Sequence, residues 1–167
     1  MIMKKLAVIL ITMGLVIALT GCLARYKSED VDRAAEQLTM QQNIDSAVKS
    51  GVKNGDYDDM VDEAARSLNA FKNSSAASNL PEEIINGLSD HLAAHQDAKV
   101  AWQDDQDNAQ KDYDAAYDEY LDDMSSISAP NIDDYFDKYD TVQDSWAKVP
   151  DLKPVADKIA ECRKTSK

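Results

Sequence analysis

Two histidines four residues apart are the side chains of this sequence best suited to bind a metal ion. In the run His91-Leu92-Ala93-Ala94-His95, both imidazoles would lie on one face of a helix, where they can share a transition-metal ion. Asp90 or Asp97 could assist only if another helix supplied a further ligand. Neither the Glu-x-x-His pattern of di-iron bundles nor a glutamate directly after His91 is present. Two interpretations stay open: histidines at the edge of a core, which is the commoner arrangement, or a metal centre.

The stretch from Trp102 to Asp123 combines aromatic and acidic side chains. From Asp104 onward it holds nine carboxylates and a single basic residue, Lys111. The simpler interpretation is a solvated acidic face opposite an aromatic seam, which would pack on Tyr135, Phe136, Tyr139 and Trp146. The alternative is a surface that binds a basic partner, since aromatic residues are enriched at interfaces. That surface would consist of Trp102, Tyr113, Asp114, Tyr117, Asp118 and Tyr120. Calcium is not expected, because no Asp-x-Asp-x-Asp-Gly loop is present.

The start of the chain has the layout of a secretory signal. Lys4 and Lys5 precede an uncharged run over 6–20, which ends in Leu19-Thr20-Gly21-Cys22. These last four residues resemble the lipobox of bacterial lipoproteins. The resemblance implies removal of residues 1–21 and attachment of a diacylglyceryl and an N-acyl lipid to Cys22, with no other cofactor. Residues 22–28 would then form a lipidated tether, and 29–167 a single domain.

An uncleaved membrane-spanning helix is the rival interpretation of the same segment. The uncharged run has only fifteen residues, whereas a bilayer core of about 30 Å requires roughly 20. Both interpretations place the domain in the cell envelope, facing away from the cytoplasm. If the host is Gram-negative, Leu23 after the cysteine indicates the inner leaflet of the outer membrane, by analogy with lipoprotein sorting in such bacteria.

Charge and missing motifs restrict the function. Removal of residues 1–21 takes away two lysines and no acidic residue, which moves the formal net charge from −13 to −15. Such a surface argues against nucleic acid, which is bound through lysine and arginine, and favours a cationic partner. No Gly-x-Ser-x-Gly elbow, phosphate-binding glycine loop or haem-attachment motif is present, and we do not expect an enzyme.

Cys162 is the only other cysteine, so it has no partner within a lipidated chain. It fits the apolar stripe of the last helix, where it would be buried as a small apolar residue. Alternatively, it forms a disulfide with another chain, for example with a second copy in a homodimer.

The pattern of apolar residues predicts an all-α fold with about five helices. The helices are expected over 29–53, 57–72, 81–125 and 131–149, and from Pro154 onward. Asn54-Gly55 is expected to end the first helix, 73–79 to form a mobile loop, and 163–167 to fray. A 45-residue third helix would be longer than a compact domain needs. We therefore expect an elongated bundle with coiled-coil-like hairpins, or a kink near 104–108.

These observations predict a lipid-anchored envelope lipoprotein that acts as a non-enzymatic binding or structural module. It would contact the bilayer through acylated Cys22 and a second envelope or surface protein through its helices. One alternative is a metal-binding lipoprotein that uses His91 and His95. A second, suggested by size and location alone, is an exclusion or immunity lipoprotein of a phage or plasmid.

Overall fold

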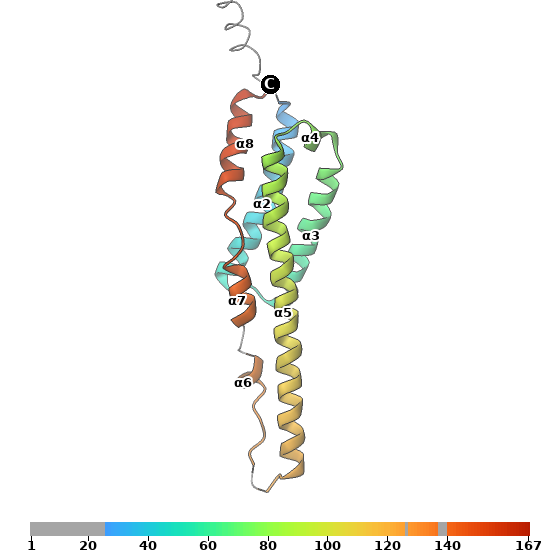
Figure 1. Cartoon of the computed structure of the whole chain (residues 1–167), viewed down its shortest axis with the longest axis vertical. Helices are drawn as coiled ribbons and strands as arrows, with labels where there is room; N and C mark the ends of the chain where they lie inside the picture. The colour runs from blue at the N-terminus through green and yellow to red at the C-terminus, as the bar shows by residue number, and fades with distance from the viewer. Residues whose placement is uncertain (1–25, 126, 137–139) are drawn as a thin grey trace, which may run out of the picture.

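The computed structural model describes residues 26–125, 127–136 and 140–167, and these residues form helices and no strands (Figure 1). The all-α prediction is therefore confirmed. Seven helices are present in the described ranges, more than the five expected. They are α2 (Ser28–Ser50), α3 (Asn54–Lys72), α4 (Ser75–Ser78), α5 (Glu82–Asp122), α6 (Asp133–Phe136), α7 (Asp140–Trp146) and α8 (Lys153–Thr165).

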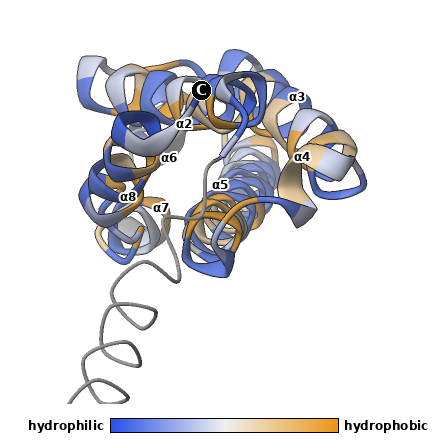
Figure 2. Cartoon of the chain, turned by 90° about the horizontal axis from the view of Figure 1, so that it is seen from above, coloured by the Kyte–Doolittle hydropathy of each residue, from blue (hydrophilic) through white to orange (hydrophobic). Residues whose placement is uncertain are grey.

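The body of the molecule is a bundle of α2, α3, the first half of α5, and α8, as Figures 1 and 2 show. The bundle forms because each helix carries one apolar stripe that must be removed from water. On α2, Val31, Ala34, Leu38 and Ile44 belong to this stripe and are all buried. On α3, Val61, Ala64, Leu68 and Phe71 form the stripe and are buried as well.

Helix α5 is continuous over 41 residues, about 60 Å at 1.5 Å per residue, and has two different halves. Every buried residue of α5 lies in its first half, and Trp102 is the last of them. The second half extends beyond the ends of α2 and α3 and is accompanied by α6 (Figure 1). The elongated arm was thus the correct alternative, because no break occurs near 104–108.

Three local predictions were wrong. Helix α2 ends at Gly51, whose φ of 83° is in the left-handed region, and Gly55 lies inside α3. The loop expected over 73–79 contains the short helix α4, which buries Ala76 and Ala77 against the bundle. The helix expected over 131–149 is replaced by α6 and α7, while 137–139 lie outside the described residues.

Both ends of the described fold meet at one end of the bundle. The backbone N–H of Lys167 donates to the carbonyl of Tyr26, and that of Ser28 donates to the carbonyl of Lys167, each at 3.2 Å. The C-terminal residues are therefore hydrogen-bonded, contrary to the frayed tail expected. Tyr26 packs against the core, so part of the expected tether belongs to the fold.

Residues 1–25, including Cys22, lie outside the described residues. Across the described ranges, no helix combines the length and apolar character needed to span a bilayer.

Candidate functional site

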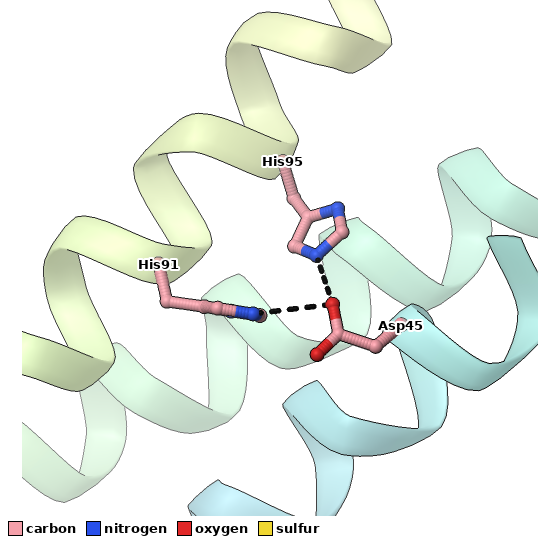
Figure 3. Close-up of side chains that lie close together, drawn as sticks. All are labelled: Asp45, His91 and His95. Atoms are coloured by element: carbon pink, nitrogen blue, oxygen red, sulfur yellow. Dashed lines mark hydrogen bonds and ion pairs between the residues drawn. The ribbon is translucent and has the colours of Figure 1, made fainter. Parts of the chain in front are cut away.

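Three side chains from two helices converge inside the bundle (Figure 3). His91 and His95 lie one turn apart on the buried face of α5, and each is 1% exposed. Asp45 of α2 points at both of them. Its Oδ1 is 3.2 Å from Nε2 of His91 and 3.1 Å from Nε2 of His95. The ligand atoms of the three residues all lie within 4.8 Å of one another.

Tyr57 of α3 fixes the outer side of His95. Its hydroxyl donates to the backbone carbonyl of His95 at 3.0 Å and lies 2.9 Å from Nδ1 of the same residue. The tyrosine ring is fully buried and packs edge-on against the imidazole, with ring centroids 5.9 Å apart. Three helices therefore hold this site: α5 carries the histidines, α2 the carboxylate, and α3 the orienting hydroxyl.

Some buried polar atoms near this site lack a hydrogen-bond partner among the described residues. They are Nδ1 of His91 and both side-chain polar atoms of Gln41, which is 1% exposed. Gln41 precedes Asp45 by one turn of α2, so the two side chains lie on the same helix face. Because buried polar groups are usually paired, these three unpaired atoms require an explanation.

The surroundings change the acidity of two groups. Burial raises the pKa of the Asp45 carboxyl, but hydrogen bonds from His91 and His95 and the positive charge of these rings when protonated outweigh it. The net effect holds the pKa of Asp45 well below its ordinary value, so this carboxylate stays anionic. Burial raises the pKa of Tyr57 to about 12. A side-chain hydrogen bond with Trp146 opposes this shift, and the negative charges of Asp58 and Asp45 add to it. Tyr57 therefore keeps its proton at neutral pH.

Sequence reasoning identified His91 and His95 but missed Asp45. Asp90 and Asp97, the carboxylates considered instead, are both exposed. A signal for Asp45 was present in the sequence of α2. Leu38, Gln41, Asp45 and Val48 follow one another at spacings of three, four and three, so the two polar residues share a helix face with apolar ones.

The acidic and aromatic stretch does not form one continuous surface. Trp102 is only 5% exposed and packs in the bundle against Tyr57 and Trp146, so it is not part of an exposed face. Trp146, expected to contact the tyrosine seam, belongs to the same cluster. The predicted side-chain contacts of Phe136 and Tyr139 are outside the described part of the structure.

The three tyrosines follow one another along the second half of α5. Tyr113 stacks on Tyr117, with ring centroids 6.0 Å apart, and meets Tyr135 of α6 edge-on at 5.8 Å. Tyr117 also contacts Tyr120 and is 40% exposed. Asp114 and Asp118 are exposed beside them. This half of α5 thus presents partly exposed aromatic rings among carboxylates.

Comparison with protein-family models, with curated proteins and with solved structures finds no match for this chain.

Proposed function

We propose that this protein is a lipid-anchored envelope lipoprotein that holds a binding arm away from the membrane. The anchor is the acylated Cys22, and the arm is the second half of α5, residues 103–122, together with 123–125 and 127–136. The protein acts as a non-enzymatic module, and the arm binds a protein with a basic surface. The observation that carries this proposal is the position of the arm at the opposite end of the molecule from the chain end nearest Cys22 (Figure 1).

The tether between lipid and fold is short. Cys22 lies four residues before Tyr26, which already packs against the core. Four residues span at most about 15 Å, so the end of the bundle formed by Tyr26 and Lys167 would stay close to the lipid. A diacylglyceryl group with a further acyl chain supplies more than the two chains that stable attachment requires. The tip of the arm, about 60 Å farther along α5, would then face a partner.

The surface of the arm suits protein binding. In the described parts of the chain, five of the six large apolar side chains that are exposed lie between 117 and 132. They are Tyr117, Leu121, Met124, Ile127 and Ile132. Such a concentration of exposed apolar groups is typical of interaction sites. Carboxylates surround it, including Asp114 and Asp118, so electrostatic complementarity favours a basic partner.

The lipid anchor is tested by labelling cells that express the full chain with a fatty acid that carries a chemical tag. We expect the label on the wild type, a mature protein that lacks residues 1–21, and neither in Cys22→Ser. An unlabelled wild type would overturn the anchor.

The arm is tested by photo-crosslinking in intact cells. A crosslinking amino acid at Leu121 should capture one defined protein, and raised salt should weaken capture if charges steer the contact. The matched control places the same group at Glu63, which is exposed on α3 in the body of the bundle. Equal capture from both positions, or none from Leu121, would contradict the proposed docking surface.

A further inference from the structure

We propose that Asp45, His91 and His95 bind one divalent transition-metal ion, with zinc as the best match, and that this ion links α2 to α5. This inference goes beyond the role of a membrane-anchored binding arm and does not depend on it. The site lies in the body of the bundle, and the arm begins farther along α5.

The distances fit a tetrahedral ion. Zinc binds histidine nitrogen and carboxylate oxygen at about 2.0–2.2 Å, so neighbouring ligand atoms in a tetrahedron stand about 3.3–3.5 Å apart. Oδ1 of Asp45 lies 3.1 and 3.2 Å from the two Nε2 atoms. The ligand atoms all lie within 4.8 Å of one another, so the most widely separated pair would have to move closer when an ion binds. Three protein ligands would leave the fourth position for water.

Hydrogen bonding around His95 is compatible with a metal ion on Nε2. The Tyr57 hydroxyl can donate its one proton to the carbonyl of His95 at 3.0 Å and then accept from N–H at Nδ1, 2.9 Å away. In a neutral ring this arrangement leaves the lone pair of Nε2 facing Oδ1 of Asp45, 3.1 Å away, where a metal ion would bind both atoms. When no ion is bound, the Tyr57 hydroxyl can instead donate to Nδ1, and Nε2–H then donates to Asp45.

The tyrosine also supplies the hydrogen-bond partner that metal-bound histidines ordinarily have. A ligating histidine donates its other ring N–H to a fixed acceptor, which sets the tautomer and the orientation of the ring. Tyr57 would take this place for His95, because its hydroxyl lies 2.9 Å from Nδ1. Gln41, one turn before Asp45 and without a partner among the described residues, offers a buried amide to a metal-bound water.

The donor set selects the class of metal. Two imidazoles and one carboxylate suit zinc, cobalt, nickel or copper, whereas calcium and magnesium prefer oxygen ligands alone. Asp45 is the most exposed member of the three, with 28% of its side chain accessible, so it marks the side from which an ion enters.

The experiment is a titration of the full-length chain, purified in detergent and treated with a chelator, with zinc chloride and with cobalt chloride. We expect one zinc per chain in competition with a coloured chelator, and the visible absorption of tetrahedral cobalt. Asp45→Asn keeps the size of the side chain and removes the anionic ligand, so it should weaken zinc binding at least 100-fold. The matched control Asp97→Asn removes an exposed carboxylate that neighbours the same histidines, and it should bind as the wild type does.

Two further measurements keep the result decisive. Circular dichroism of each chelator-treated variant establishes that the bundle is folded before metal is added. Tyr57→Phe should weaken zinc binding 10–100-fold, because it removes the hydrogen-bond partner of a ligating histidine. A folded wild type that binds no zinc, or identical zinc binding in Asp45→Asn and Asp97→Asn, would overturn the site. The second outcome would mean that Asp45 is not a ligand, and the first would leave the three side chains as a hydrogen-bonded cluster that binds no metal.

Discussion

The hydroxyl of Tyr57 on α3 contacts His95 on α5 twice, once at the backbone carbonyl and once at Nδ1 of the ring. This pair joins two helices through polar atoms inside the bundle. Within the bundle, the tyrosine ring also meets Trp102 and Trp146 at centroid separations of 5.6 and 5.7 Å. One phenol therefore serves both the packing of the core and the orientation of a candidate ligand.

We predict that Tyr57→Phe destabilises the metal-free protein by about 1–3 kcal/mol, because it leaves the buried Nδ1 of His95 without a partner. Urea unfolding in the presence of a chelator measures this change. Tyr113→Phe is the matched control: its ring is half-buried on the arm, and the change should stay within about 0.5 kcal/mol. Equal stabilities of Tyr57→Phe and the wild type would show that the hydroxyl is not needed to satisfy His95.

The two halves of α5 should respond differently to the same substitution. Leu88 is fully buried and Leu121 is 50% exposed. Leu88→Ala removes core contacts and should cost about 2–5 kcal/mol of unfolding free energy. Leu121→Ala should change it by no more than about 0.5 kcal/mol. Urea unfolding of both variants measures the difference, and a large loss in Leu121→Ala would mean that another surface covers the arm in solution.

Gly87 on α5 lies directly against Val155 on α8. A methyl group at Gly87 would overlap the Cγ2 methyl of Val155, a stiff β-branched side chain. Alanine ordinarily stabilises a helix by about 1 kcal/mol relative to glycine, but overpacking costs about 1–3 kcal/mol. We therefore predict that Gly87→Ala lowers the thermal midpoint. Gly87→Ala combined with Val155→Ala should recover part of the loss, and a rise in the single variant would refute the close contact.

Much of the fold could be predicted from sequence because long helices show a regular spacing of apolar residues. The stripe from Val31 to Ile44 and the two histidines on one face of a helix required nothing but the period of an α-helix. The place where the bundle ends on α5 could not be predicted in this way. Trp102 and Tyr113 continue the same apolar spacing, yet Trp102 is buried because α7 and α3 cover it, whereas Tyr113 has only α6 beside it.

The third member of the candidate site shows the same limit. Asp45 meets His91 and His95 because α2 and α5 pack with one particular offset along their lengths, and the sequence pattern of either helix leaves that offset undetermined. The two short helices α6 and α7 were likewise predicted as one, because apolar spacing alone does not reveal where the chain departs from a helix.

Cys162 should react slowly in the folded protein. Its thiol is 2% exposed, and burial raises its pKa, with Glu161 adding to the shift and Lys158 and the Tyr26 hydroxyl opposing it. A raised pKa means that the folded state keeps the thiol proton to higher pH than the unfolded chain does. The thiolate fraction is therefore smaller in the folded state, and the stability that this proton contributes is lost as pH rises through about 9 and above.

The prediction is tested in the full-length Cys22→Ser variant, where Cys162 is the only cysteine. Iodoacetamide at pH 8 should modify the folded protein at least ten times more slowly than the urea-unfolded protein, as mass spectrometry would measure. The rate in the folded protein should rise with pH at higher values than the rate in urea does. Fast modification of the folded protein at pH 8 would contradict the burial of this thiol.

The last prediction concerns the two buried glutamines of α2, which differ in their partners. Gln37 donates from Nε2 to the hydroxyl of Ser67 at 2.9 Å, whereas neither polar atom of Gln41 has a partner among the described residues. Methionine matches the length of glutamine and carries no group that must be solvated. In a chelator, Gln41→Met should therefore raise the unfolding free energy by about 1–3 kcal/mol, because it removes an unsatisfied buried amide. Gln37→Met, the matched control, loses a hydrogen bond and should lower the unfolding free energy.

With zinc bound, the gain in Gln41→Met should shrink if the amide holds a metal-bound water. A loss of stability in both variants without metal would show instead that Gln41 is already hydrogen-bonded to water in the folded bundle.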